Sequence, residues 1–339
     1  MFNKRKINPV SSFLLLILVF GLISMNTQAE RNTEPIQVSL TGYRPSGPIQ
    51  VTGDGDFDPA IWNEDGTSDG TICRPWILDG WEFDADIRAI EIYNTDDTFI
   101  IRNCSFKNCD VGILLYSMEN GQICENTFQT NEYGVVLNQS AEDTCVSMNI
   151  FELNIIAISL QATENINIFS NIMYDNGYGI DLGVGARYTF VKYNNVTTST
   201  FDGIRIIAAQ YNLIERNNID SNTLYGVSIQ DTMSNEILEN NFLDNNLGLV
   251  QGYDDLLLNK WYKNYWTDWI SGPYAIDGPG GNSDASPNPL YYTIDPEDTC
   301  LCDSCYCVTA TANSAGIIVI GLSLAFVSMI IYNKKRKRK

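Results

Sequence analysis

This chain of 339 residues is 44% hydrophobic and 18% charged, and its formal net charge at pH 7 is −20. That balance fits one globular domain with attached segments and excludes intrinsically disordered and collagen-like proteins. The absence of histidine excludes imidazole as a catalytic base or metal ligand. Lysine and arginine cluster at the two termini alone, so nucleic-acid binding is not expected.

The N-terminus has the three-part layout of a secretory signal. Three basic residues at 4–6 precede an apolar run at 13–23, and small residues follow it. As a helix, that run is too short to cross a hydrocarbon core of about 30 Å. The sequence predicts a cleaved signal peptide over 1–29 and an N-terminal cap region over 30–75.

Acidic residues alternate around a glycine within the cap region, at Asp54, Asp56 and Asp58. Hard cations favour such oxygen-rich spacing, although the glutamate that completes a 12-residue Ca²⁺ loop is missing. We therefore expect either a Ca²⁺ site at these three residues or a solvated acidic turn over the first repeat.

A period of 22 to 23 residues organises the chain over 76–266. Apolar residues recur in step at Phe83, Phe106, Phe128, Phe151, Met173, Val196, Ile219, Phe242 and Tyr265. A second ladder in the same phase has a small residue followed by apolar-x-apolar, as in Gly134-Val135-Val136-Leu137. Alternation at period 2 predicts short strands, and stacking of the repeats predicts an all-β fold, a parallel β-helix of about nine coils.

A column of asparagines keeps the same period, at Asn126, Asn149, Asn171, Asn194, Asn217 and Asn240. Stacked amides can hydrogen-bond from coil to coil, and asparagine tolerates the left-handed backbone of a tight turn. We interpret the column as a structural bend between strands; the alternative is a binding ladder.

One face of the second ladder holds the candidate catalytic residues. Asp181 and Arg205 occupy equivalent places on adjacent coils, and Asp202 lies three residues before Arg205. Grouped carboxylates beside a basic residue are the chemistry of polysaccharide cleavage, whereas an exposed ion pair is the ordinary alternative. Candidate ligand-binding aromatics on the same side are Tyr116, Tyr178 and Tyr225, because aromatic rings suit stacking against sugars.

Nine cysteines in an exported chain indicate oxidation, and the odd number leaves one without a partner in this chain. Five lie in the first coils, at Cys73, Cys104, Cys109, Cys124 and Cys145, and their pairing cannot be derived from the sequence. Four more, Cys300, Cys302, Cys305 and Cys307, form a compact cluster that either makes disulfides or binds a metal ion. Asn138 and Asn195 are the better glycosylation triplets.

The C-terminus has the pattern of a membrane anchor. After a closing loop over 267–299 and a Cys-rich linker over 300–314, an uncharged apolar run at 315–332 is long enough to span a bilayer. The basic tail at 333–339 is expected to stay in the cytoplasm, which places the bulk of the chain outside the cell on a single transmembrane helix.

Six segments carry a family resemblance: GTSDGT at 66–71, PWILDGWEF at 75–83, IEIYNT at 90–95, FIIRNC at 99–104, NYWTDW at 264–269 and PYAIDG at 273–278. Over about 49–290 the chain resembles archaeal surface proteins with NosD-like repeats, within the pectate-lyase-like β-helix superfamily. The resemblance implies right-handed coiling. For function it implies carbohydrate binding, sugar cleavage or copper handling, without choosing among them.

Together these patterns predict a membrane-anchored surface protein that binds a polysaccharide or cell-surface glycan, or forms part of the cell envelope, without catalysing a reaction. A polysaccharide lyase or glycoside hydrolase working on the strand face is the first alternative. Copper handling through the cysteine cluster is the second. The sequence establishes no cofactor, and Ca²⁺ is the one candidate.

Overall fold

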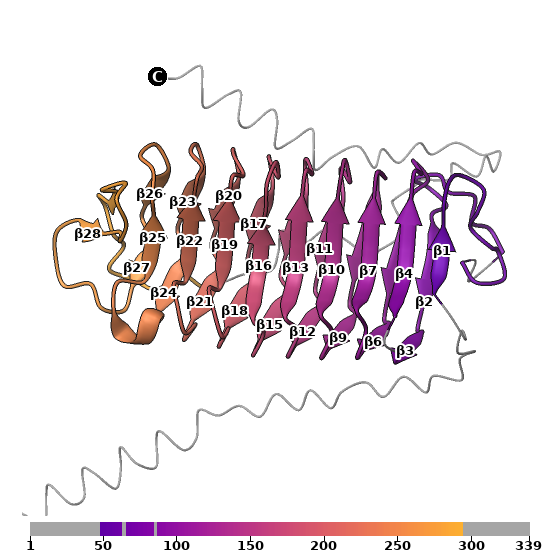
Figure 1. The fold of residues 1–339 in the computed structure, drawn as a ribbon, viewed down its shortest axis with the longest axis horizontal. Helices are drawn as coiled ribbons and strands as arrows, with labels where there is room; N and C mark the ends of the chain where they lie inside the picture. Colours follow the sequence, from indigo (N-terminus) through magenta and orange to yellow (C-terminus); the bar gives the residue numbers. More distant parts are fainter. Residues whose placement is uncertain (1–47, 63–65, 85–86, 294–339) are drawn as a thin grey trace, which may run out of the picture.

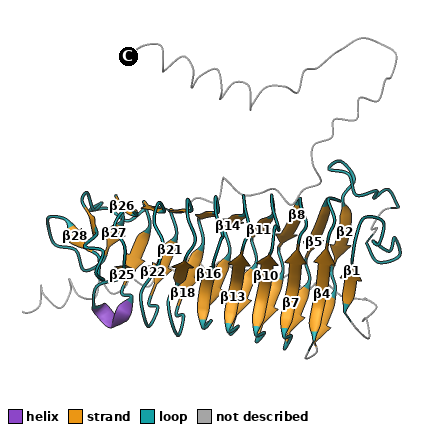
Figure 2. Cartoon of the chain, turned by 45° about the horizontal axis from the view of Figure 1, so that its top comes forward, coloured by secondary structure: helices purple, strands orange, loops and turns teal. Residues whose placement is uncertain are grey.

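The computed structural model describes residues 48–62, 66–84 and 87–293, which form a parallel β-solenoid with three sheets (Figure 1). Each sheet holds nine strands, so the chain makes about eight turns between the first and last strand of a sheet. The all-β parallel β-helix predicted from the 23-residue period is confirmed. No α-helix occurs in the described part of the chain, and one 3-10 turn, η1 (Asn246–Gly248), lies near the C-terminal end (Figure 2).

Sheet A contains the longest strands. It consists of β1 (Ile49–Val51), β4 (Arg88–Tyr93), β7 (Val111–Tyr116), β10 (Tyr133–Asn138), β13 (Ile156–Gln161), β16 (Tyr178–Leu182), β19 (Ile204–Ile207), β22 (Val227–Gln230) and β25 (Gly252–Asp254).

Sheet B follows sheet A in each coil. It consists of β2 (Trp76–Asp79), β5 (Phe99–Arg102), β8 (Gly121–Cys124), β11 (Cys145–Ser147), β14 (Asn167–Phe169), β17 (Phe190–Lys192), β20 (Leu213–Glu215), β23 (Glu236–Leu238) and β26 (Lys260–Tyr262).

Sheet C completes each coil. It consists of β3 (Glu82–Asp84), β6 (Ser105–Lys107), β9 (Thr127–Gln129), β12 (Ile150–Glu152), β15 (Ile172–Tyr174), β18 (Asn195–Thr197), β21 (Asn218–Asp220), β24 (Asn241–Leu243) and β27 (Tyr265–Trp266). A short antiparallel pair, β28 (Tyr274–Ala275) with β29 (Ser283–Asp284), follows the last coil.

The core is a stack of like residues, because equivalent positions in successive coils pair in register. Rings of neighbouring sheet C strands stack on one another, as Phe106 and Phe128 do with centroids 4.7 Å apart. The last position of this ladder is Trp266 rather than the expected Tyr265, since Trp266 pairs with Phe242 and is buried. Extra residues around η1 shift the spacing in this last coil.

A small residue stands near the start of the sheet A strands for a steric reason. A Cβ added at Gly134 would lie 2.5 Å from the carbonyl oxygen of Ala157 and 2.8 Å from Cδ1 of Phe151. The chain therefore needs a small residue where it turns from sheet C into sheet A over the stacked rings.

Buried asparagines form three ladders, where the sequence predicted one. The first runs from Asn126 to Asn264 and lies at the turn between sheets B and C. In each step the side-chain amide nitrogen donates to the side-chain oxygen of the next asparagine, as Asn171 does to Asn194 at 3.0 Å, and to a backbone carbonyl. The structural interpretation of the column is confirmed, but the left-handed φ lies one residue before each asparagine, as at Tyr193.

The other two ladders lie at the remaining corners. One consists of Asn131, Asn154 and Asn176 and, after Ser199, of Asn222 and Asn245. The other consists of Asn212, Asn235 and Asn259. In all three ladders each asparagine donates to the next one toward the C-terminus. The last asparagine of each ladder therefore has an unpaired donor unless another residue supplies an acceptor.

Buried acceptors close the ladders at the C-terminal end. Asp284 accepts hydrogen bonds from the backbone and side-chain nitrogens of Asn264 at 2.8 and 3.1 Å. Asp254 accepts one from Asn259 at 2.9 Å, and Gln251 accepts one from Asn245. These contacts satisfy donors that burial would otherwise leave unpaired at a cost of about 1–3 kcal/mol each.

Several predicted segments lie outside the described residues: the signal peptide at 1–29, the Cys-rich linker at 300–314, the transmembrane helix at 315–332 and the tail at 333–339. Within the described ranges, no helix is long and apolar enough to span a membrane.

Candidate functional site

The outer face of sheet A varies from coil to coil, unlike the repetitive core. The register places Ser159, Asp181, Arg205, Ser228 and Tyr253 in one column on successive strands. The sequence alone places Val250 after Ser228, and the residues inserted around η1 put Tyr253 there instead. In Figure 1 the nine strands of sheet A lie side by side, with no other described strand laid over them.

Asp181 and Arg205 form a bidentate ion pair on adjacent strands, as their equivalent positions predicted. Arg205 donates from Nε and Nη2 to the two carboxylate oxygens of Asp181 at 2.8 and 2.9 Å. The carboxylate is nearly buried, with 8% of the side chain exposed, while the guanidinium is 24% exposed. Cζ of Arg205 also lies 4.1 Å from the ring centroid of Tyr178, so the cation is held by a carboxylate and an aromatic face together.

Asp202 lies beside this pair but is engaged with the next coil. Its oxygens accept hydrogen bonds from the backbone nitrogen of Tyr225 at 3.0 Å and from Oγ of Ser228 at 2.8 Å. Burial raises the pKa of Asp202 above its ordinary value, and the two hydrogen bonds offset this only in part. The three predicted catalytic residues are thus neighbours, but both carboxyl groups are occupied by partners within the protein.

Aromatic pairs follow the same face along the solenoid. Tyr93 and Tyr116 meet edge to face with centroids 5.9 Å apart. Near the ion pair, Tyr178 and Phe201 stack at 4.9 Å, and Phe201 is 41% exposed. Tyr225 and Tyr253 form a third pair toward the C-terminal end, at 5.2 Å.

The three predicted ligand-binding tyrosines each belong to one of these pairs. The hydroxyl of Tyr116 donates to Oε1 of Gln139. That of Tyr225 donates to Oδ2 of Asp277 at 2.7 Å, and burial together with this carboxylate raises the pKa of Tyr225 to about 12. The hydroxyl of Tyr225 therefore remains protonated at neutral pH and does not serve as a phenolate base.

The predicted calcium triplet is not brought together. Asp56 accepts from the hydroxyl of Thr52, and Asp58 from the backbone nitrogen of Ala60, so both stabilise local turns. Asp54 points instead toward the next coil, where it accepts from Oγ1 of Thr95 at 2.7 Å.

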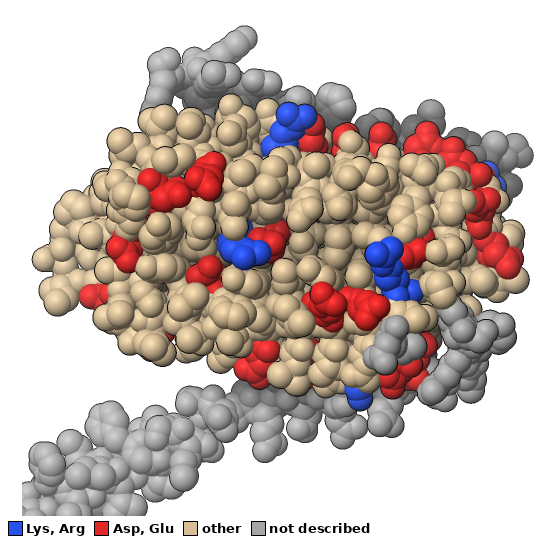
Figure 3. Space-filling view, viewed as in Figure 1, with Lys and Arg blue, Asp and Glu red and all other residues tan. Residues whose placement is uncertain are grey.

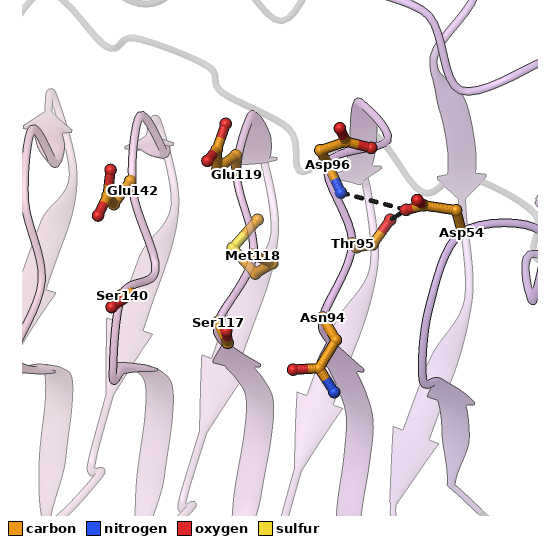
Figure 4. A pocket seen from close by; sticks show the side chains of 9 residues that line it. All are labelled: Asp54, Asn94, Thr95, Asp96, Ser117, Met118, Glu119, Ser140 and Glu142. Carbon is orange, nitrogen blue, oxygen red and sulfur yellow. Dashed lines mark hydrogen bonds between the residues drawn. The ribbon is translucent and has the colours of Figure 1, made fainter.

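Asp54, Asp96 and Asp97 form a different oxygen cluster, with carboxylate oxygens within 4.8 Å of one another. It borders a pocket of about 370 Å³ that extends over three coils (Figure 4). Side chains of Glu119 and Glu142 follow in a row along this pocket, one per coil. Because the cap lacks the 23-residue repeat, the sequence offered no register to place Asp54 beside these residues.

Three of the described cysteines, Cys73, Cys124 and Cys145, are disulfide-bonded. The other two occupy the first position of an asparagine ladder each: the backbone nitrogen of Cys104 donates to Asn126, and that of Cys109 to Asn131. Burial raises the pKa of Cys104 to about 12. Cys300, Cys302, Cys305 and Cys307 lie outside the described residues.

The two glycosylation triplets lie on strands. Asn138 is the last residue of β10 and Asn195 the first of β18. Asn195 is half-buried, and its side-chain oxygen accepts from Asn218 at 2.8 Å. Asn138 and Asn195 are both half-buried, and the residue after Asn138 is exposed.

The charge of the surface is strongly one-sided. The described residues carry 32 carboxylate side chains against ten lysine and arginine side chains. Nine of those ten cations are ion-paired: Arg74, Arg88, Arg102, Arg187, Lys192, Arg205, Arg216, Lys260 and Lys263. Figure 3 shows the result, because the few cationic side chains in view lie beside acidic ones.

Comparison with known proteins identifies a family. The family model described as "Periplasmic copper-binding protein (NosD)" matches residues 83–157 and 146–268. No curated protein matches the sequence significantly.

Among solved structures, two variants of the periplasmic alginate epimerase AlgG are similar, with TM-scores of 0.43 and 0.42 at 19% and 18% identity. The matches cover 53% and 62% of this chain but 43% and 53% of the AlgG chains, so this chain spans about half of their length. The A-module of the Azotobacter vinelandii mannuronan C-5 epimerase AlgE6 gives 0.43 at 13% identity, covering 56% of this chain and 68% of the module. These likenesses concern the fold alone.

Proposed function

Because the chain belongs to the NosD family, whose model matches more than half of its residues, we propose that it is an exported right-handed β-helix that binds a polysaccharide along the outer face of sheet A. The periplasmic description of the family supports a place outside the cytoplasm. Binding without cleavage is the proposed activity, and the apolar run at 315–332 is the proposed membrane anchor.

One observation carries the proposal: three aromatic pairs follow one uncovered sheet face. Tyr116 on β7 and Tyr253 on β25 are six coils apart, or about 29 Å at the usual strand spacing of about 4.8 Å. Rings at both ends and near the middle of this span suit a linear polymer that lies along the axis, since sugar rings present apolar faces to aromatic side chains. Because Asp181 and Arg205 pair with each other at the centre of the face, the face suits a ligand bound by stacking and hydrogen bonds.

Cleavage is the second candidate, and one observation favours it. Burial raises the pKa of Asp202, which is the direction required of a general acid near neutral pH. Both oxygens of Asp202 are engaged by Tyr225 and Ser228, however, and Asp181 is engaged by Arg205. A carboxyl group that already has these partners is poorly placed to protonate a glycosidic oxygen, so binding is preferred.

Copper does not fit the donors in the described residues. The chain has no histidine, and the five described cysteines are in disulfides or at the start of an asparagine ladder. In that part of the chain, the one cluster of potential ligands consists of three aspartates, whose oxygens suit hard cations rather than copper. Copper handling through Cys300, Cys302, Cys305 and Cys307 stays a prediction.

A glycan array probed with the purified full chain tests the proposal, with Ca²⁺ and with EDTA in parallel. We expect the wild-type protein to bind at least one polysaccharide on the array. Its affinity for that polysaccharide should fall about tenfold when Tyr178 and Phe201 are both replaced by alanine, as expected for the loss of about 1.4 kcal/mol of stacking. The matched control replaces Tyr188 and Tyr211, a stacked and exposed pair at another corner with centroids 5.5 Å apart. That control should bind as the wild type does.

Each bound polysaccharide is then incubated with the protein and its products are sized. Unchanged length supports a binding module. Shortened products that disappear in Asp202→Asn would make the chain an enzyme, and the absence of any bound glycan would refute the proposal. If glycan binding depends on Ca²⁺, and this dependence is lost in Asp96→Asn, then Ca²⁺ is a cofactor bound by Asp54, Asp96 and Asp97.

A further inference from the structure

The cations of sheet A are already neutralised, and this bears on the class of polysaccharide that the face accepts. Within the strands of sheet A, the basic residues are Arg88 on β4 and Arg205 on β19. Arg88 donates from Nη1 to Glu91 at 3.0 Å, and Glu91 is buried. Arg205 is the cation that lies among the aromatic pairs.

Asp181 already occupies the side-on edge of the Arg205 guanidinium, formed by Nε–H and Nη2–H. Proteins bind a sugar carboxylate most specifically through two parallel N–H groups of one guanidinium. In Arg205, Nε and Nη2 are both directed at Asp181, and the ring of Tyr178 covers one face of the group. An incoming carboxylate has only the end-on edge of the group, at Nη1 and Nη2, and it meets a cation whose charge the nearly buried Asp181 already neutralises.

The carboxylates around Arg205 also disfavour a negatively charged ligand. Asp202 lies close enough to Arg205 to act on it electrostatically, and Asp277 lies at the hydroxyl of Tyr225. Two carboxyl groups, those of Asp181 and Asp202, thus act on one guanidinium, and a third lies at the neighbouring tyrosine. A polymer with one negative charge per sugar would meet repulsion along its length, on a surface that already carries a large excess of carboxylates.

We propose that the sheet A face selects neutral or amine-bearing polysaccharides and rejects polyuronates, and that Asp181 sets this selectivity by occupying Arg205. This inference rests on the proposed function, since it names the ligand class of the same face. Asp181 is a specificity-determining residue here: it need not touch the sugar, because it acts through the guanidinium that it holds.

The test compares hexasaccharides of three classes on the full chain at 20 and 150 mM NaCl: neutral glucans, mannans and galactans; a glucosamine oligomer; and galacturonate and mannuronate oligomers. We expect neutral or glucosamine hexamers to bind at least tenfold more tightly than either uronate at both salt concentrations. Uronate binding within tenfold of the best neutral ligand overturns the inference while leaving the proposed function intact. Absence of binding in all three classes refutes the proposed function itself.

The variant Asp181→Asn releases Arg205 while keeping a side chain of the same shape. We expect it to gain uronate binding by at least tenfold at 20 mM NaCl. The matched control is Asp79→Asn, which releases Arg102 from an equivalent pair on sheet B, where Nε lies 2.7 Å from the carboxylate. Uronate binding should not rise in that control.

Circular dichroism melting verifies that both variants are folded. If Asp181→Asn does not fold, the conservative variant Arg205→Lys provides the second arm: lysine cannot make the bidentate pair, so uronate binding should rise there as well. A folded variant of either kind that gains no uronate binding overturns the role assigned to Asp181.

Discussion

The corners of the solenoid and the outer face of sheet A are built from the same coils but follow opposite rules. At the corner between sheets B and C, asparagine recurs in every coil from Asn126 to Asn264, and each makes the same hydrogen bonds. On the face of sheet A, one column changes from Ser159 to Asp181, Arg205, Ser228 and Tyr253. Repetition marks residues that hold the coils together, and variation along a column marks residues that are free to meet a ligand.

Breaking one rung of the ladder should have the largest effect. Asn194→Ala removes the acceptor of Asn171 and the donor to the carbonyl groups of Ile168 and Lys192. Several buried groups lose their partners at once, so we expect the free energy of unfolding to fall by about 3–5 kcal/mol in chemical denaturation. The neighbouring Asn195→Ala is the control and should cost less than about 1 kcal/mol, because water can replace its outer hydrogen bond. Equal losses would show that the ladder has no special role.

Removing aromatic rings from the face should affect binding more than folding. The Tyr178→Ala and Phe201→Ala double variant loses one exposed stacked pair, worth about 0.5–1.5 kcal/mol beyond the area that its rings bury. We expect a loss of stability well below that of Asn194→Ala together with the tenfold loss of glycan affinity. Thermal melting and titration on the same preparation measure both. A variant as unstable as Asn194→Ala would place these rings among the structural residues.

The buried carboxyl group beside the face should give a pH-dependent effect. Because burial raises the pKa of Asp202 in the folded state, the contribution of this group to stability is fully present below its unfolded pKa and is lost as pH rises through its folded pKa. Asp202→Asn does not ionise, so its stability relative to the wild type should increase between pH 4 and pH 7. Denaturation at intervals of half a pH unit follows the difference. A constant difference would contradict the raised pKa.

The start of the ladder offers the smallest and most informative change. Cys104 takes the place of an asparagine: the backbone nitrogen of Trp81 donates to its sulfur at 3.4 Å, and the sulfur lies 3.1 Å from the carbonyl oxygen of Arg102. Cys104→Asn should therefore extend the ladder by one rung and raise stability by about 0.5–1 kcal/mol. Cys104→Val, similar in size but without a donor, should lower it. If Cys104→Asn is less stable than Cys104→Val, the explanation that Cys104 stands in for an asparagine of the ladder is wrong.

Much of the fold was predictable because the period fixes the register. Once coils of 23 residues stack, Asp181 must lie beside Arg205, and their pairing was expected. The second and third asparagine ladders were visible at Asn131, Asn154 and Asn176 and at Asn212, Asn235 and Asn259. They were missed because Ser199 interrupts one and the other has three members.

The remaining features depend on geometry that the period does not specify. Asp202 reaches Ser228 through the shape of a turn, and the inserted residues around η1 put Tyr253 in the column of Arg205. Asp54 meets Asp96 and Asp97 from a cap that has no repeat, whereas Asp56 and Asp58 take part in local turns. The description of the matching family names a periplasmic location and copper, and the donors in the described residues do not suit copper.

The uniform direction of the ladders also makes the coil a modular unit. Every internal coil receives a hydrogen bond from the coil before it and donates one to the coil after it, and the special groups stand at the ends: Cys104 and Cys109 first, Asp254 and Asp284 last. Duplication or deletion of one internal repeat of 23 residues would leave both ends intact and change the length by about 4.8 Å. The reach of such a protein across a polymer is therefore adjustable in steps by simple duplication of its coding sequence.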